Sequence, residues 1–114
     1  MSIQKITPFT RKDLFGGRGT VNIWNLMGKK NASPFSAVLW CELAPKGIVG
    51  LHRQQDDPEI VICIEGQGKA KVSGTEHDLE AGSMVHLPHG SSLAIKNLAD
   101  SPLRYLIIKA KAQP

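Results

Sequence analysis

The stretch from residue 52 to residue 68, HRQQDDPEIVICIEGQG, joins a short polar segment to an apolar run that ends in glycine. His52 and Gln54 are two residues apart, so on an extended chain their side chains point the same way. Glu59 opens the apolar run after turn residues at DDP (56–58). An imidazole, an amide and a carboxylate at this spacing make a candidate ligand site, and the apolar run is a candidate β-strand.

The apolar run 59–65 carries apolar side chains on both of its faces. One face comprises Glu59, Val61 and Cys63, and the other comprises Ile60, Ile62 and Ile64. A strand of this kind needs cover on both sides. One face would line the interior of the domain, and the isoleucine face must pack on another layer or on another subunit. This pattern predicts a homodimer.

The rest of the chain repeats short apolar segments between glycine and proline clusters. Segments of four to nine residues rich in Val, Ile, Leu and Trp alternate with turn residues, which is typical of an all-β sandwich or barrel. In FSAVLWCEL (35–43) the alternation places Cys41 on the core side of a half-buried strand. Residues 20–114 are expected to form one domain. Residues 1–19 form an N-terminal arm, either extended or with a short helical turn, to which no function is assigned.

A second glycine-bounded stretch, GSMVHLPHGSSLAIKN, runs from residue 82 to residue 97. Its spaced positions are Gly82, Pro88, Gly90, Leu93 and Asn97. Gly66 and Gly82 are far enough apart for two further strands and a turn between them.

The two stretches together resemble the conserved motifs of small single-domain cupins. The first cupin motif has His-x-His, three or four residues, Glu, six residues and Gly, and residues 52–66 follow it except at Gln54. The second has Gly, five residues, Pro-x-Gly, two residues, His, three residues and Asn, and residues 82–97 follow it except at Leu93. The resemblance implies a cupin-type double-stranded β-helix, or jelly-roll, barrel.

The departures from the cupin pattern fall on its metal ligands. The resemblance implies three histidines and one carboxylate around iron, manganese, nickel or zinc. His52 and Glu59 match this set, whereas Gln54 and Leu93 stand where the second and third histidines would be. An amide oxygen is a poorer ligand for these ions, and leucine is none. The tentative metal set is therefore His52, Gln54 and Glu59, and His86 or His89 could supply a further nitrogen.

Other roles for these residues remain open. His52 and Glu59 could form an ion pair inside the barrel, which would raise the pKa of the histidine and lower that of the carboxyl, and they could act as general base and acid. Leu93 shares a face with Ile95 and could complete the core. The expected ligand cavity comprises His52, Gln54, Glu59, Cys63, His86 and Leu93. For Cys63 a place in the core is favoured over one on the cavity wall, and Tyr105 and Arg53 are further polar candidates.

Composition and charge narrow the class of protein. The net charge is +4, but the basic residues flank predicted strands or lie in the tail, so we do not expect a nucleic-acid partner. No apolar run approaches the ~20 residues that span a bilayer. The N-terminus has no apolar segment of signal-peptide type. Cys41 and Cys63 form no CxxC pair, which favours free thiols and a cytoplasmic location.

Three functions follow as hypotheses. The first is a barrel that binds a small polar or carbohydrate-like organic ligand, without metal or with weakly held metal. The second, implied by the resemblance to cupins, is a metal-dependent oxygenase, isomerase or lyase that uses His52, Gln54 and Glu59. The third is the ligand-sensing partner of a transcription regulator. The sequence leaves open whether the protein is an enzyme.

Overall fold

The computed structural model describes residues 6–53 and 56–112. These residues form strands and one short 3-10 turn, so the predicted all-β class is confirmed. The elements are β1 (Phe9–Lys12), η1 (Leu14–Gly16), β2 (Thr20–Asn25), β3 (Phe35–Leu43), β4 (Ile48–Arg53), β5 (Glu59–Glu65), β6 (Gly68–Val72), β7 (Thr75–Leu79), β8 (Met84–Leu87), β9 (Ser92–Asn97) and β10 (Leu103–Ala110).

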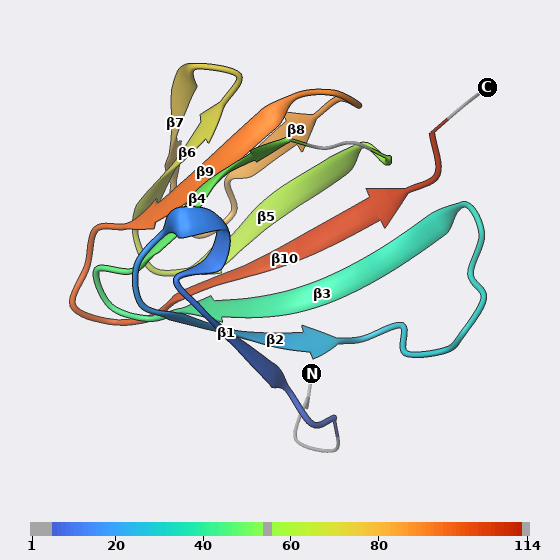
Figure 1. The fold of residues 1–114 in the computed structure, drawn as a ribbon, viewed down its shortest axis with the longest axis horizontal. Helices are drawn as coiled ribbons and strands as arrows, with labels where there is room; N and C mark the ends of the chain where they lie inside the picture. Colours follow the sequence, from blue (N-terminus) through green and yellow to red (C-terminus); the bar gives the residue numbers. More distant parts are fainter. Residues whose placement is uncertain (1–5, 54–55, 113–114) are drawn as a thin grey trace.

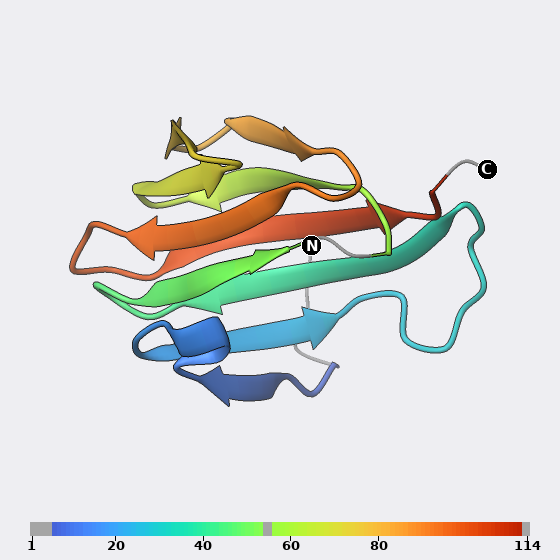
Figure 2. The same ribbon diagram turned by 45° about the horizontal axis from the view of Figure 1, so that its top comes forward.

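The strands build two antiparallel sheets that face each other as a jelly-roll barrel. The larger sheet has the order β1-β2-β3-β10-β5-β8, and the smaller has the order β4-β9-β6-β7. Figure 1 shows the long strands β3 and β10 side by side in the larger sheet, with β4 and β9 over one part of it. In the turned view of Figure 2 the strands β1, β2 and β3 (blue to teal) follow one another at one edge of the molecule, in the order of the larger sheet. Strands that are distant in sequence thus become neighbours, as β10 does between β3 and β5.

The core lies between the two sheets and follows the predicted alternation. In β3 the side chains of Cys41 and Leu43 are buried, and in β5 those of Glu59, Val61 and Cys63 are buried. The apolar core comprises Val21, Ile23, Cys41, Leu43, Val49, Val61, Cys63, Ala70, Leu79, Val85, Leu87, Leu93, Ile95, Leu103 and Tyr105. Glu59 and Asn97 are the polar residues buried with this set in the described chain.

Two residues of the glycine-bounded stretches have a structural role. Gly66, which follows β5, has a φ of +106°, and a Cβ there would lie 2.9 Å from the carbonyl oxygen of Pro102. Asn97 is 1% exposed, and its Nδ2 lies 2.8 Å from the carbonyl oxygen of Ser101 and 3.0 Å from that of Ala44. Gly66 and Asn97 each join the end of one strand to a neighbouring turn. These two motif residues therefore have a structural role in the barrel.

The outer face of the larger sheet is apolar across several strands. Antiparallel register aligns Trp24, Trp40, Leu106, Ile62 and Met84 in one row across β2, β3, β10, β5 and β8. A second row comprises Val38, Ile108, Ile60 and His86. In the described part of the chain, the elements in close contact are neighbouring strands, and η1 packs on β4. In β5 the buried side chains are those of Glu59, Val61 and Cys63, so the isoleucine side chains between them point away from the barrel interior.

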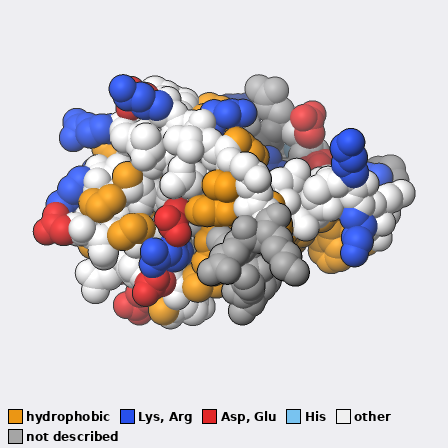
Figure 3. Space-filling model, turned by 90° about the horizontal axis from the view of Figure 1, so that it is seen from below, with side chains coloured by type: hydrophobic (Ala, Val, Ile, Leu, Met, Phe, Trp, Pro, Cys, Tyr) orange, Lys and Arg blue, Asp and Glu red, His pale blue; other side chains and the backbone are white. Residues whose placement is uncertain are grey.

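Hydrophobic side chains also reach the surface elsewhere. Figure 3 shows them in several groups separated by lysine, arginine and carboxylate side chains. Met84, Leu51 and Phe15 are among the more exposed large apolar residues, at 57%, 65% and 54%. No helix within the described ranges is long and apolar enough to cross a membrane.

The N-terminal arm combines the two conformations expected for it. Residues 9–12 form β1, an edge strand paired with β2, and residues 14–16 form the 3-10 turn η1. The arm thus extends the larger sheet by one strand and then crosses to β4 of the smaller sheet.

Candidate functional site

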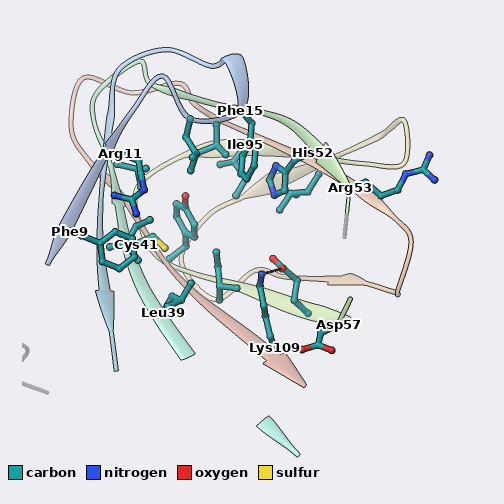
Figure 4. A pocket seen from close by; sticks show the side chains of 18 of the residues that line it. Phe9, Arg11, Phe15, Leu39, Cys41, His52, Arg53, Asp57, Ile95 and Lys109 are labelled. Atoms are coloured by element: carbon teal, nitrogen blue, oxygen red, sulfur yellow. Dashed lines mark ion pairs between the residues drawn. The ribbon is translucent and has the colours of Figure 1, made fainter. Parts of the chain in front are cut away.

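A cavity of about 780 Å³ opens between the two sheets, as Figure 4 shows. This volume lies within the roughly 300–1,000 Å³ range of small-molecule sites. Apolar residues such as Leu39, Leu93 and Ile95 form much of its wall. The polar groups on the wall include Arg11, His52, Glu59, Tyr105 and Lys109. A concave, mostly apolar site with a few convergent polar groups is suited to a small organic ligand.

His52 is held in one orientation near the end of β4. Its Nδ1 lies 3.0 Å from the carbonyl oxygen of Gly50, and a carbonyl can only accept, so Nδ1 carries the hydrogen. The Phe15 ring stacks on the imidazole at a centroid distance of 4.0 Å and an interplanar angle of 15°. Burial lowers the pKa of His52. The residue therefore offers a neutral ring with Nε2 as acceptor.

Glu59 is the first residue of β5 and lies on the inner face of the sheet with only 4% of its surface exposed. Its Oε1 lies 3.7 Å from Nζ of Lys109, which is too long for a hydrogen bond, so the contact is an ion pair. That buried oxygen has no hydrogen-bond partner in the described structure. Burial raises the pKa of Glu59, although the nearby Lys109 acts in the opposite direction.

The ion pair that was one alternative for His52 and Glu59 is not formed among the described residues. No contact joins their side chains among the described ion pairs, in which Lys109 is the partner of Glu59. The two pKa shifts also run opposite to the expectation, since that of His52 falls and that of Glu59 rises. Desolvation is the largest cause in both cases, and burial disfavours the charged form of each group.

The described donors do not fit a four-ligand metal centre. Leu93 is 1% exposed and pairs in register with His52 across β4 and β9, so an apolar side chain fills the position of the third cupin histidine. Gln54 lies outside the described residues. Within the described ranges, no group of three or more His, Cys, Asp or Glu side chains is placed to hold a metal ion. The ammonium of Lys109 already supplies positive charge beside Glu59.

The structure places two other expected cavity residues away from the cavity wall. His86 is exposed on the outer face of β8, opposite Ile60, because alternation turns Val85 and Leu87 inward. Cys63 is 1% exposed and belongs to the core. His89 lies at an exposed turn after β8 and is not on the wall either.

Cys41 is the thiol that reaches the cavity wall, next to Tyr105. Burial raises the pKa of Cys41 to about 12, so the sulfur stays protonated and is a poor nucleophile. Both cysteines are free and buried, as the sequence predicted. Tyr105 and Arg53 also lie on the wall, in agreement with their selection as polar candidates.

Sequence reasoning missed the contributions of the arm and of Lys109. Phe9, Arg11 and Phe15 line the cavity, although no motif or spacing singles them out. The place of Lys109 on the cavity wall could have been predicted, because its side chain shares the inward face of β10 with those of Tyr105 and Ile107.

Comparison with known proteins agrees with this geometry. The model of the cupin domain family, Cupin_2, matches residues 39–109, which is more than half of the chain. The protein is a small cupin barrel in architecture. The chain belongs to the cupin family.

Individual relatives cover nearly the whole barrel. An oxalate-binding protein of Thermotoga maritima is 29% identical over 106 residues, which are 91% of this chain and 87% of the relative. The crystal structure of a predicted oxalate decarboxylase from Thermotoga maritima superposes with a TM-score of 0.90 at 25% identity, covering 97% of each chain. A cupin 2 conserved barrel domain protein from Salinispora arenicola superposes with a TM-score of 0.70 at 27% identity, covering 81% of this chain and 76% of that one.

Proposed function

We propose that this cupin binds a small polar organic ligand in the barrel cavity without depending on a resident transition metal. The observation that carries the proposal is the environment of Glu59. This buried carboxylate is on the cavity wall, takes its countercharge from Lys109 and has at Oε1 no hydrogen-bond partner among the described residues. A buried acceptor without a partner is costly, and a ligand that donates a hydrogen bond would remove that cost.

The ligand class is a small carboxylate or a carbohydrate-like molecule. The similarity to an oxalate-binding protein, at 29% identity, supports the carboxylate. The cavity is large enough for a monosaccharide-sized molecule as well.

Calorimetry on chelator-treated protein tests the proposal. The probes are oxalate, malonate, D-glucuronate and D-glucose, each titrated into wild type and into His52→Ala. We expect at least one probe to bind wild type and to lose affinity in the variant, with a matching rise in melting temperature for wild type alone. Equal heats for both proteins with every probe would contradict the proposal.

The alternative is a metal-dependent cupin enzyme in which His52, Gln54 and Glu59 bind iron, manganese, nickel or zinc and His52 and Glu59 take acid–base roles. One observation favours it. Because Nδ1 of His52 donates its hydrogen to the carbonyl oxygen of Gly50, Nε2 keeps a lone pair that can coordinate a metal ion, as in metal-bound histidines. Metal analysis after soaking and desalting distinguishes the two. About one equivalent of a transition metal would favour the enzyme, and a trace would favour the metal-free binder.

We further propose that two chains associate through the outer face of the larger sheet. Two apolar rows in register across four or five strands make a surface that can pack on a second copy of itself.

The free, buried state of Cys41 and Cys63 supports a cytoplasmic location for the protein.

A further inference from the structure

We propose that Arg11, carried by the N-terminal arm, is the residue that makes the cavity select ligands with an anionic group. This inference rests on the proposed ligand-binding function of the cavity and assigns its charge specificity. It also gives residues 9–19 of the arm a role as a wall of the binding site.

The arm is fixed to the barrel by close backbone contacts. Arg18 N donates to the carbonyl oxygen of Ile48 at 2.8 Å, and Ile48 N donates back to Arg18 at 2.8 Å. A Cβ on Gly17 would lie 1.9 Å from the carbonyl oxygen of Ile48, and a Cβ on Gly50 would lie 1.9 Å from that of Phe15. The two backbones meet at a distance that only glycine permits. The arm is therefore held firmly against β4.

The turn that follows β1 is closed by its own hydrogen bonds. Asp13 N donates to the carbonyl oxygen of Gly19 at 2.8 Å, and Gly19 N donates to Asp13 Oδ1 at 2.9 Å. Asp13 and Phe15 adopt φ angles of 52° and 55°, which are costly for residues other than glycine. This conformation brings the Phe15 ring onto His52, as Figure 4 shows. A strained backbone conformation of this kind persists where the surrounding structure fixes it. Here that conformation places the Phe15 ring at the ligand site.

Arg11 reaches from β1 toward the cavity on the side away from Lys109, as Figure 4 shows. Its guanidinium lies 4.7 Å from the centre of the Phe9 ring. Its other contact within the described chain is a long hydrogen bond of 3.4 Å, in which Nη1 donates to the carbonyl oxygen of Thr10. No carboxylate of the described chain forms an ion pair with it. The planar guanidinium thus keeps most of its donors for a ligand.

The other charged groups of the cavity have a polar partner, point away or are exposed. Lys109 is beside Glu59, and Asp57 Oδ2 accepts a hydrogen bond from Ser36 Oγ at 2.5 Å. Arg53 lies at the rim and points away from the cavity in Figure 4, and Asp56 is exposed. Arg11 is exposed at the mouth of the cavity, on the face of β1 that lines it, and among the described residues no carboxylate pairs with it. A carboxylate is a natural partner, since it accepts two parallel hydrogen bonds from a guanidinium.

Calorimetry with matched probes tests the inference on the full chain. D-glucuronate and D-glucose differ by a carboxylate, and malonate and malonamide differ by their charge. Wild type should bind each anion more tightly than its neutral counterpart. Arg11→Gln should weaken anion binding by roughly tenfold to 100-fold and leave neutral binding within about twofold. Arg11→Lys keeps the charge and should retain part of the preference.

The matched control is Lys12→Gln, which removes the neighbouring positive charge on the opposite face of β1 and should leave the preference unchanged. Melting curves establish that each variant is folded. If Arg11→Gln binds the anions as wild type does, the role of Arg11 is overturned while ligand binding stands. If wild type prefers the neutral probes, the inference is overturned as well. Absence of binding to every probe overturns the proposed function together with this inference.

Discussion

At position 93 the chain has leucine where the cupin pattern has its third histidine, and the structure places that side chain directly across from His52. Restoring the imidazole should restore metal affinity, because a third nitrogen or oxygen donor then joins His52 and Glu59. We expect Leu93→His to retain about one equivalent of Ni²⁺ or Zn²⁺ after desalting. Burying the imidazole should also cost about 1–3 kcal/mol of stability.

Leu93→Ala is the control for this change, since it removes the same packing without adding a donor. It should lose about 2–4 kcal/mol of stability and bind no more metal than wild type. Metal content and calorimetric affinity are the measurements. An unchanged metal content in Leu93→His would show that His52 and Glu59 are not placed as ligands.

Glu59 predicts a pH dependence of stability. Burial raises its folded-state pKa above the ordinary 4.5, so the carboxyl contributes stability below about pH 4.5, and that contribution is lost as the pH rises through the folded-state pKa. Glu59→Gln cannot ionise. Its stability relative to wild type should therefore increase as the pH rises above 4.5, as measured by chemical denaturation at a series of pH values.

Asp78 serves as a control, because its pKa is shifted in the direction opposite to that of Glu59. A hydrogen bond from Lys69 at 2.8 Å and its charge lower the pKa of Asp78 below the ordinary 3.8. This carboxylate contributes stability above pH 3.8, which is lost as the pH falls through the folded-state pKa. Asp78→Asn should therefore lose stability relative to wild type as the pH rises into that range. The same trend in both variants would contradict the assigned cause of the Glu59 shift.

At the scale of elements, alternation and turn residues predicted most of the barrel. The strand at 35–43 and its inward Cys41 were read from a period of two, which holds because one face packs on the core and the other does not. The cupin spacing predicted a common cavity for His52, Glu59 and Leu93, and all three line it.

The sequence could not place the arm or set the charge pairing in the cavity. The arm binds β4 through backbone contacts at Gly17 and Gly50, and such contacts leave no periodic pattern in side chains. The partner of Glu59 is Lys109, fifty residues away, and its position depends on β10 pairing with β5. The expected histidine partner was nearer in sequence but lies on the other sheet.

The contact between the arm and β4 gives a prediction for Gly50→Ala. The new Cβ would lie 1.9 Å from the carbonyl oxygen of Phe15, so the arm must move away. We expect a loss of about 1–3 kcal/mol in unfolding free energy, faster proteolysis before residue 20 and weaker anion binding. Gly17→Ala should act alike, and the double variant should cost less than the sum of the two because both displace one contact. Full additivity would show that the two glycines act separately.

At the scale of the whole molecule, the two faces of the larger sheet have different tasks. The inner face closes the core and the cavity, and the outer face presents Trp40, Leu106 and Ile62 in register. One end of this face is charged, where Arg104 pairs with Glu42 and Glu65. An apolar centre with a polar margin is the usual composition of a stable protein interface.

Sedimentation tests whether this face joins two chains. Ile62 lies at the centre of the longer row, between Leu106 and Met84, so in a dimer an Ile62→Lys charge would be buried without a partner. We expect wild type to sediment as a dimer, and Ile62→Lys to dissociate with affinity reduced by roughly 100-fold or more. Leu98→Lys adds the same charge to a side chain 42% exposed outside the larger sheet and should remain dimeric. A monomeric wild type would contradict the dimer, and a dimer unaffected by Ile62→Lys would place the interface on another face.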